Sequence, residues 1–339
     1  MSKGDHQDNA SYKSSRILVT GGTGSIGIEL VRELLRIGPK EVRVLSNDEN
    51  GLFEASNFLE PSGRLNFYLG DVRDPRSIER VIKGCDVVFH AAALKHVIFC
   101  EQNPYEAIST NIVGTQNMID AAVKHSVKRF VFISTDKAVN PVSAMGATKL
   151  LGERLIFSAS KLARQPVFST VRFGNVLGSR GSVALIFEKQ VREGKAITVT
   201  DPSMTRFIMA PSDASALILR AGELSRPGEL FVLKMKTVRI GDLAEACKAF
   251  FGEMYGRDPR KVATVVTGPQ AGEKMHEQLM TDDEAAEAHD LGDYLLINPS
   301  PSRDAKAQRA GAGRAASNLY PVANRAEIIA MLKKVYAKR

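Results

Sequence analysis

Short apolar runs alternate with longer amphipathic stretches along the first part of the chain. The apolar runs predict strands at 17–20, 41–45, 65–69, 87–90 and 130–134. The stretches between them have the helical period and predict helices near 25–37, 49–59, 75–83 and 103–125. Strands that are apolar throughout and alternate with helices are typical of a parallel sheet covered on both faces. The pattern therefore predicts an α/β fold with a Rossmann-like, doubly wound parallel sheet.

This alternation becomes less regular after about residue 180. Apolar runs predict strands at 197–199, 231–233 and 262–266, and periodic stretches predict helices near 211–224, 239–250 and 324–336. We interpret this part as a smaller, partly interleaved substrate domain. The expected divisions are a flexible N-terminus at 1–15, a Rossmann domain at 16–180 to which some later segments return, a substrate domain at 181–298, and a mobile linker with a C-terminal helix at 299–339.

Composition and charge narrow the range of partners. The chain has 339 residues, 44% of them hydrophobic, which is enough for a full core. Its formal charge of +8 comes from scattered basic residues, without the basic motif studded with aromatic residues that is typical of nucleic-acid binders. We therefore expect no nucleic acid partner, and either an anionic small molecule or merely a basic surface.

The cysteines and the apolar runs bear on location. Cys85, Cys100 and Cys247 have no metal-ligand spacing and no paired framework, so we expect packing residues in a reducing cytoplasm and no metal site. No apolar run is long enough to cross a bilayer, and the polar N-terminus lacks the apolar segment of a signal peptide. The sequence predicts a cytoplasmic protein without a membrane span.

A glycine-rich turn follows the first predicted strand and opens the first predicted helix. The segment I-L-V-T-G-G-T-G-S-I-G places Gly21, Gly24 and Gly27 there. Glycines in this context let the turn close and let a pyrophosphate approach the backbone N–H groups at the positive end of the helix. We therefore predict a dinucleotide site.

The end of the second predicted strand bears on which dinucleotide binds. NAD sites usually have a carboxylate there for the adenosine ribose, but this chain has Ser46 and Asn47. These side chains can donate hydrogen bonds to a 2′-phosphate, so the pattern favours NADP, while Asp48 or Glu49 offers the carboxylate that NAD would need. Asp71 follows the third strand and either faces the adenine amine or is an ordinary loop residue.

Reactive side chains follow the fifth predicted strand. Its carboxyl end lies where open α/β sheets hold their ligands, so we expect Thr135, Asp136 and Lys137 to project into the nicotinamide crevice. Met145 and Lys149 are one helical turn apart on the next helix, from which Lys149 is able to reach the nicotinamide ribose. The alternative is that Asp136 and Lys137 form an ordinary surface ion pair.

Several motifs together resemble those of the extended short-chain dehydrogenase/reductases. They are T-G-G-T-G-S-I-G, H-A-A-A-L-K-H-V, T-N-I-V-G-T, S-T-D-K-A-V-N-P, M-G-A-T-K, V-R-F-G-N-V-L-G-S-R-G-S-V, D-P-S-M-T-R-F-I-M and A-G-E-K-M-H-E. Within that family the chain looks most like the nucleotide-sugar 4,6-dehydratases of the polysaccharide-biosynthesis type, which act on UDP-N-acetylglucosamine. The resemblance covers roughly residues 15 to 295.

The resemblance implies a UDP-sugar substrate and a tightly bound NAD(P) that is regenerated in each cycle. The sugar C4 hydroxyl is oxidised, water leaves from C5 and C6, and the hydride returns to C6. By the same likeness Asp136 is the acid near the C6 oxygen and Lys137 the base near C5. An ion pair between them favours the opposite protonation states, so burial must oppose the pairing.

Most short-chain dehydrogenases have a tyrosine base where this chain has Met145, and some 4,6-dehydratases share the methionine. A thioether cannot accept a proton. Our hypothesis is that Asp136 accepts the C4 proton and later delivers one to the C6 hydroxyl, with Thr135 orienting the sugar and Met145 serving packing and shape.

The resemblance also implies the binding residues. The expected cofactor contacts are Gly21, Thr23, Gly24, Ser25, Ile26, Gly27, Ser46, Asn47, Asp71, Val72, Ala91, Ala92 and Lys149. The expected substrate contacts are Lys95 and His96 at the sugar, Asn175, Arg206 and Arg180 at the diphosphate, and Glu273 at the uridine ribose. Simpler alternatives are a structural histidine for His96, a solvated surface residue for Arg180 and a helix-start carboxylate for Glu273. Asn111 is expected to hold the active-site helix in place.

Three kinds of function remain open from the sequence. The first is a UDP-N-acetylglucosamine 4,6-dehydratase, the second another nucleotide-sugar enzyme such as a 4-epimerase or a 5,6-dehydratase, and the third a non-catalytic dinucleotide-binding protein. Epimerases normally rely on the tyrosine that is missing here. Because the family tends toward dimers or larger assemblies, we expect a homo-oligomer.

Overall fold

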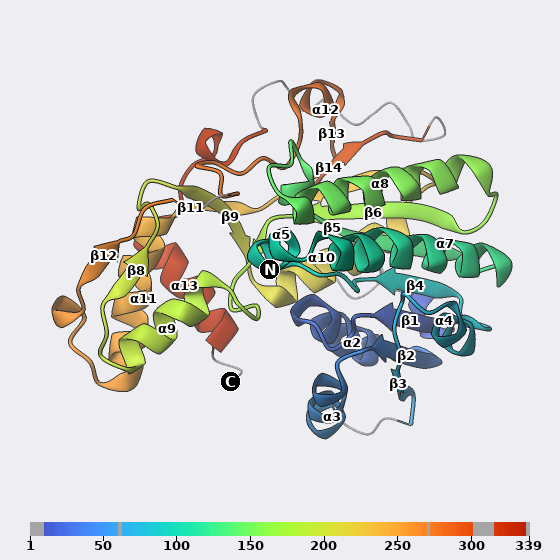
Figure 1. The fold of residues 1–339 in the computed structure, drawn as a ribbon, viewed down its shortest axis with the longest axis horizontal. Coiled ribbons are helices and arrows are strands. Elements are labelled where there is room, and N and C mark those ends of the chain that lie inside the picture. Colours follow the sequence, from blue (N-terminus) through green and yellow to red (C-terminus); the bar gives the residue numbers. More distant parts are fainter. Residues whose placement is uncertain (1–9, 60–62, 270–271, 301–314, 337–339) are drawn as a thin grey trace.

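A nine-stranded sheet forms the centre of the computed structural model, which describes residues 10–59, 63–269, 272–300 and 315–336. Its strand order is β13-β14-β10-β6-β5-β4-β1-β2-β3; the seven strands from β10 to β3 in this order run parallel to one another, and β14 is antiparallel to β10. The strands are β1 Arg16–Thr20, β2 Glu41–Ser46, β3 Leu65–Leu69, β4 Val87–His90, β5 Arg129–Thr135, β6 Val167–Phe173, β10 Leu230–Leu233, β13 His289–Asp290 and β14 Tyr294–Ile297. The predicted doubly wound α/β sheet is confirmed (Figure 1).

Helices cover both faces of this sheet because the strands carry apolar side chains on both faces. In β1, Ile17 and Val19 pack into one hydrophobic cluster and Leu18 into another. The first cluster includes side chains of α2 (Ser25–Ile37), α3 (Glu49–Phe58) and α10 (Pro211–Leu224). The second includes those of α4 (Pro75–Ile82), α7 (Gly114–Lys124) and α8 (Ala144–Leu162).

A second, smaller body lies beside the carboxyl ends of the central strands (Figure 1). Its helices are α9 (Val183–Arg192), α11 (Ile240–Tyr255) and α13 (Arg325–Tyr336), which share a core containing Phe187, Phe251 and Leu332. Its strands are β7 Asn175–Val176, β8 Ile197–Val199, β9 Thr205–Met209, β11 Lys236–Arg239 and β12 Thr264–Val266. Strands β10 and β14 return to the central sheet, so the two bodies are interleaved.

The long helix predicted near 103–125 is interrupted. It consists of α6 (Pro104–Ile108), a π-helical turn at Ser109–Val113 and then α7. Asn111 lies in the π-helical turn, where it accepts a hydrogen bond from Leu94 N (2.8 Å) and donates to Thr148 Oγ1 of α8 (2.9 Å). Asn111 thus makes the contact to the active-site helix that was expected of it.

Two predictions about the ends of the chain are wrong in part. Residues 10–13 form helix α1, where Tyr12 is buried and donates a hydrogen bond to Leu219 O (2.7 Å), so the flexible N-terminus does not extend to residue 15. Ser317 is also buried, in a turn at the end of the predicted linker. Residues 1–9 and 301–314, on which the rest of these predictions falls, lie outside the described residues.

The predicted packing role of the cysteines is confirmed by burial. Cys85, Cys100 and Cys247 are all buried free thiols. Across the described ranges, none of the helices has the length and hydropathy that a membrane span requires.

Candidate active site

A cavity of about 1200 Å³ lies at the carboxyl edge of the central strands and extends to the second body. All the residues predicted to contact the cofactor or the substrate line it. They are Gly21, Thr23, Gly24, Ser25, Ile26, Gly27, Ser46, Asn47, Asp71, Val72, Ala91, Ala92, Lys95, His96, Lys149, Asn175, Arg180, Arg206 and Glu273. Of the predicted catalytic group, Thr135, Lys137 and Met145 also line the cavity, whereas Asp136 does not.

The glycine-rich turn after β1 fits a pyrophosphate. Gly21 has a φ of +63°, and a Cβ there would lie 2.7 Å from Ala92 Cα. A Cβ at Gly27 would lie 2.2 Å from the carbonyl oxygen of Gly21, so neither position tolerates a side chain. Gly24 is the N-cap of α2 and brings no capping side chain. The first amides of α2 and the positive end of its dipole are therefore available to an anion.

Polar side chains crowd the end of β2, where an adenosine ribose is expected. Ser46 Oγ lies 2.8 Å from Thr23 Oγ1, and Asn47 Nδ2 donates to Asp71 Oδ2 at 3.1 Å. Asp48 caps α3 by accepting from Gly51 N (2.9 Å) and pairs with Arg180 at 3.2 Å. The Gly51 hydrogen bond and Arg180 together outweigh burial and lower the pKa of Asp48, so this carboxylate is ionised and already engaged.

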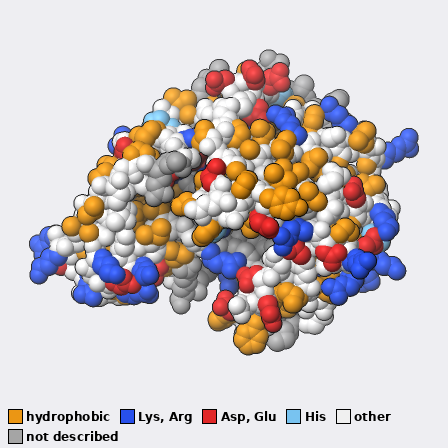
Figure 2. All heavy atoms as spheres, in the orientation of Figure 1, with side chains coloured by type: hydrophobic (Ala, Val, Ile, Leu, Met, Phe, Trp, Pro, Cys, Tyr) orange, Lys and Arg blue, Asp and Glu red, His pale blue; other side chains and the backbone are white. Residues whose placement is uncertain are grey.

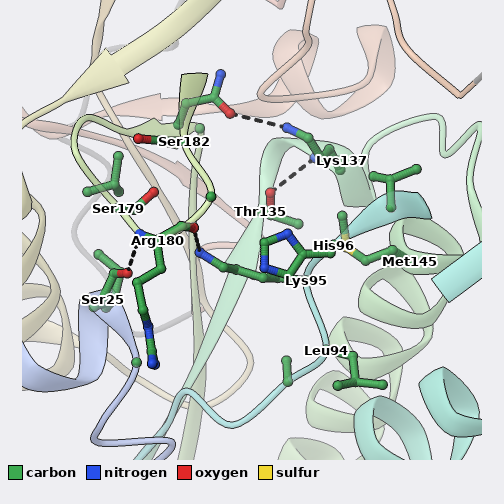
Figure 3. Close-up of a pocket in the computed structure, with 18 of the residues that line it drawn as sticks. Ser25, Leu94, Lys95, His96, Thr135, Lys137, Met145, Ser179, Arg180 and Ser182 are labelled. Atoms are coloured by element: carbon green, nitrogen blue, oxygen red, sulfur yellow. Dashed lines mark hydrogen bonds between the residues drawn. The ribbon is translucent and has the colours of Figure 1, made fainter. Parts of the chain in front are cut away.

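Arg180 lies across the glycine-rich turn. Its backbone N–H donates to Ser25 Oγ (2.9 Å) and its guanidinium to Thr23 O (2.9 Å), while its carbonyl oxygen accepts from Lys95 Nζ (2.8 Å), as Figure 3 shows in part. Arg180 precedes α9, so it joins the second body to the dinucleotide loop. The prediction of a diphosphate contact stays untested, and the guanidinium lies at the ribose end of the cavity.

Burial is the main cause that lowers the pKa of both basic residues beside Arg180. In Lys95 the charge of Arg180 adds to burial, and in His96 the charges of Lys95 and Arg180 do so. His96 is therefore neutral at pH 7, and both residues present hydrogen-bonding groups to the cavity.

The end of β5 presents alternate side chains to the cavity. Figure 3 shows Thr135 and Lys137 on the cavity side. Asp136 has no exposed surface and does not line the cavity, so the prediction that it projects into the crevice is wrong. It begins the 3₁₀ turn Asp136–Ala138 that follows β5, and it lies behind the two cavity-facing side chains, to which it is hydrogen-bonded. Asp136 Oδ1 accepts from Thr135 Oγ1 (2.9 Å) and from Lys137 Nζ (3.0 Å).

The amine of Lys137 is surrounded by acceptors. Besides Asp136, its Nζ lies 3.4 Å from Asn175 Oδ1 and 3.4 Å from Glu277 Oε1. Burial lowers the pKa of Lys137, but the carboxylates of Asp136 and Glu277 outweigh burial and raise it. Desolvation therefore does not neutralise Lys137 in the resting protein, and its amine is an ammonium.

Glu277 is a residue of this centre that the sequence analysis missed. It is the last residue of A-G-E-K-M-H-E, the motif in which only Glu273 was assigned a role. Both glutamates line the cavity, but Glu277 is buried and pairs with Lys137. Nothing in the motif's spacing distinguishes the two carboxylates, because the distinction depends on which one the tertiary structure turns inward.

Lys149 and Met145 lie one turn apart on α8, as predicted. Lys149 Nζ donates to Ile133 O (2.6 Å), and burial lowers its pKa to about 8 against the opposing charge of Glu153. Met145 packs with Cys100 and Ala107 in a small apolar cluster, which fits a packing role.

Arg206 lines the cavity near Glu277 and is held by backbone oxygens. Its Nη1 donates to Thr205 O at 2.9 Å and to Met275 O at 3.3 Å. Its Nε lies 4.0 Å from Oε1 of Glu277. The guanidinium thus keeps part of its donor capacity for a ligand.

A buried ion-pair network supports the reacting strand from behind. Arg172 on β6 pairs with Glu153 on α8 (2.6 Å) and with Glu284 on α12, Asp282–Glu287 (2.7 Å). Glu153 also accepts a hydrogen bond from Ser134, which precedes Thr135 on β5, at 2.5 Å. The network therefore ties β5 and the active-site helix to the segment that follows Glu277.

The chain is similar to known proteins over most of its length. The model of the family described as "Polysaccharide biosynthesis protein" matches residues 17–299. An uncharacterised membrane protein of Methanocaldococcus jannaschii is 49% identical over 85% of this chain and 87% of its own. A UDP-glucose 4-epimerase of Rickettsia canadensis is 40% identical over 86% of this chain and 85% of its own.

Solved structures agree with the fold. The structure of Pen from Bacillus thuringiensis has a TM-score of 0.88 and 40% identity, and the match covers 95% of this chain and 98% of that one. The dTDP-glucose 4,6-dehydratase DesIV of Streptomyces venezuelae, solved with NAD, has a TM-score of 0.67 and 25% identity over 77% of this chain and 86% of its own. The chain therefore belongs to the polysaccharide biosynthesis protein family, within the extended short-chain dehydrogenase/reductases.

Proposed function

We propose that the protein is an NADP-dependent 4,6-dehydratase that removes water from UDP-N-acetylglucosamine to give a UDP-4-keto-6-deoxy-N-acetylhexosamine. The observation that carries this proposal is the hydrogen bond between Lys137 and Asp136 beside the cavity, at the end of the strand that also faces Lys149. An elimination across one carbon–carbon bond needs two proton-transfer groups within reach of each other. A bound nicotinamide would supply the hydride chemistry by taking a hydride from C4 and returning it to C6.

The protein's own residues would manage the protons. The Asp136 carboxylate accepts the proton of the C4 hydroxyl, and neutral Lys137 then accepts the C5 proton. Asp136 gives its proton to the C6 oxygen, which leaves as water. Lys137 finally returns a proton to C5, so both residues end in the states in which they began. Thr135, bonded to Asp136, orients the sugar.

This cycle begins from an ionised Asp136 and a neutral Lys137. The resting ion pair holds one proton more, on Lys137, because the pKa of that amine is raised by the neighbouring carboxylates against the effect of burial. Lys137, which lines the cavity, therefore gives that proton to solvent before catalysis. Asp136 has no exposed surface, so its proton transfers would pass along the hydrogen bonds that link it to Thr135 and Lys137.

The environment of the adenosine end supports NADP over NAD. Ser46 and Asn47 bring no charge that would repel a 2′-phosphate, and Arg180 adds a guanidinium beside them. Asp48, the carboxylate that NAD would need, is engaged in a helix cap and an ion pair. The 2′-phosphate of NADP can replace Asp48 as the partner of the Arg180 guanidinium, because exposed ion pairs are weak.

A 4-epimerase is the second candidate, because relatives from Rickettsia at about 40% identity are named UDP-glucose 4-epimerase. An epimerase needs only oxidation and reduction at C4, for which a base such as tyrosine suffices. Met145 provides no such base, and although Asp136 could take the C4 proton, the second proton-transfer group, Lys137, has no task in epimerisation. A 5,6-dehydratase would form a different product and a non-catalytic binding protein would form none, so product analysis separates both from the proposed enzyme.

Incubation with UDP-N-acetylglucosamine and NADP, followed by mass spectrometry and NMR, tests the proposal. A product lighter by one water with a C4 ketone supports it, whereas the same mass without the ketone identifies a 5,6-dehydratase. A product of unchanged mass with inverted C4 identifies an epimerase, and an unchanged substrate with bound dinucleotide identifies a binding protein. Solvent deuterium at C5 of the product reports the proton returned there.

We also propose that the protein is a homo-oligomer. Figure 2 shows hydrophobic side chains gathered over the face that carries α5 (Val97–Gln102) and α7. The exposed apolar residues of this region include Ile98, Phe99, Tyr105, Ile108 and Val113. Apolar groups gathered in this way commonly mark an interface. Light scattering at several concentrations measures the mass, and a monomer throughout would reject association.

A further inference from the structure

Glu277 is a buried carboxylate to which the reaction proposed above assigns no task. Its side chain is only 5% exposed, and its Oε1 lies 3.4 Å from Nζ of Lys137. Its other oxygen, Oε2, has no hydrogen-bond partner within the described part of the chain. Buried polar groups are ordinarily hydrogen-bonded, and an unsatisfied one calls for an explanation. Glu277 lines the cavity, so its charge lies where the groups that exchange protons with a ligand are placed.

The backbone of Glu277 is fixed by Ser317, which is itself hydrogen-bonded to β9. Its N–H donates to Ser317 Oγ (3.0 Å), and its carbonyl oxygen accepts from Ser317 N (2.8 Å). Ser317 Oγ lies 2.6 Å from Thr205 Oγ1 on β9. The carboxylate is therefore held in place from outside the turn that carries Lys137, and it acts as a fixed charge.

Lys137 is the group on which this charge acts. An ammonium has three N–H donors, and three acceptors surround this one: Asp136 at 3.0 Å, Asn175 at 3.4 Å and Glu277 at 3.4 Å. Asp136 follows directly on β5, whereas Glu277 approaches from the segment before α12. The amine is thus held between carboxylates from separate parts of the fold.

Two further cations face the same cluster. Arg206 lies 4.0 Å from Glu277, and Lys274 donates to Val139 O at 2.6 Å, beside the turn of Lys137. Burial and Arg206 lower the pKa of Lys137, and the carboxylates of Asp136 and Glu277 outweigh them. The protonation of Lys137 therefore depends on Glu277 as well as on its sequence neighbour.

We infer that Glu277 is a positioning residue, which together with Asp136 clamps the amine of Lys137 at the cavity wall and keeps the proton on it until substrate binds. The kinetic consequence rests on the proposed function, but the clamp is a property of the protein alone. Glu277 does not itself exchange protons with the sugar in this assignment. It acts through Lys137.

Glu277→Gln tests the clamp because it keeps the size of the side chain and removes its charge. Reductive methylation with ¹³C-formaldehyde labels the lysine amines, and the Lys137 signal is the one absent from Lys137→Arg. In Glu277→Gln we expect this signal to titrate at lower pH than in the wild type. Glu277→Asp retains the charge on a shorter side chain, so its Lys137 signal should titrate at a pH between those of Glu277→Gln and the wild type. Where the glutamine variant fails to fold, the aspartate variant serves, with a smaller shift in the same direction.

Glu287→Gln is the matched control, since it removes the same charge from an exposed position on α12. It should leave the Lys137 titration unchanged. An unchanged titration in both Glu277→Gln and Glu277→Asp would overturn the inference. The NMR measurement uses no substrate, so its outcome is separate from that of the proposed function.

The kinetic arm applies if the wild type dehydrates UDP-N-acetylglucosamine. In Glu277→Gln the acidic limb of the kcat profile should move to lower pH, and kcat at the optimum should fall about tenfold because the amine loses part of its fixed orientation. A loss of kcat without movement of the limb would indicate a merely structural role and would reject the assignment.

Discussion

The amine of Lys137 lies 3.0 Å from Oδ1 of Asp136 and faces the cavity, whereas the Asp136 carboxylate has no exposed surface. A ligand in the cavity therefore meets Lys137 and Thr135 first and reaches Asp136 through their hydrogen bonds. Proton transfer at Asp136 and the charge of Lys137 therefore depend on each other.

Asp136→Asn should abolish the first hydride transfer, because an amide cannot accept the proton of the C4 hydroxyl. In rapid mixing with UDP-N-acetylglucosamine we expect the rate of cofactor reduction to fall at least about 100-fold. Asp71→Asn makes the same change at the adenine end and should alter cofactor binding while leaving this rate unchanged at saturating cofactor. Undiminished reduction in Asp136→Asn would remove Asp136 from the first step.

The activity should rise with pH through the titration of Lys137. Burial lowers the pKa of this amine, but two carboxylates raise it overall, and the cycle needs the neutral form. The active form of the free enzyme is therefore scarce below the raised pKa and increases as pH rises toward it. We expect an alkaline-shifted acidic limb in kcat/KM and the same limb at lower pH in kcat, since bound sugar excludes water. If kcat/KM fell as pH rises toward the raised pKa of Lys137, neutral Lys137 would not be the base.

Lys149→Met should stabilise the protein and inactivate it. Burial lowers the pKa of Lys149 from 10.5 to about 8, so the protonated amine destabilises the folded state at neutral pH. Because the unfolded chain keeps the ordinary value, the cost is full below pH 8 and disappears as pH approaches 10.5. Urea unfolding should show a gain of about 3 kcal/mol at pH 7 that shrinks toward alkaline pH. A gain independent of pH would exclude this cause.

Arg172→Met should destabilise the protein strongly, because it leaves the carboxylates of Glu153 and Glu284 buried without their cation. Breaking one partner of a buried ion pair typically costs about 3 to 5 kcal/mol in the free energy of unfolding. Arg260→Met is the control, since Arg260 pairs with Asp258 at the surface and is 90% exposed. We expect no measurable change there. Equal effects in the two variants, measured by urea unfolding, would argue against a supporting role for the network.

Arg180→Ala should weaken dinucleotide binding. The guanidinium donates a hydrogen bond to Thr23 O of the glycine-rich turn and pairs with Asp48, so its loss removes both contacts and leaves only the backbone hydrogen bond to Ser25 Oγ between residue 180 and the cofactor loop. We expect the Kd for NADP to rise about tenfold and the Kd for NAD to change less, by the loss of one charge-assisted contact. Lys195→Ala removes a cation that pairs with Glu193 and serves as control in the same calorimetric titrations. An equal change for both dinucleotides would remove Arg180 from the discrimination.

Local pattern was sufficient for most of the fold and for the outline of the site. Apolar runs separated by helical periods predicted the parallel strands of the central sheet except β6, Val167–Phe173, and the glycine positions predicted the dinucleotide turn. Strand ends of a parallel sheet share one edge, so residues that follow strands were predicted to meet, and all of them except Asp136 line one cavity. The errors arose where local rules have little force. Tyr12 is buried by a contact with Leu219, more than two hundred residues away in the chain.

The sequence by itself determined the α/β class, the dinucleotide turn and the chemical groups at the end of β5, because these follow from short-range periodicity and from residue identity. Only the tertiary structure decided that Asp136 is buried behind Thr135 and Lys137, that Glu277 also pairs with Lys137, and that Arg180 crosses the cofactor loop. The physical reason is that side-chain direction and charge balance depend on residues that approach from distant segments. The pKa of Lys137 is raised by one carboxylate that adjoins it in the chain and by another that only folding brings near.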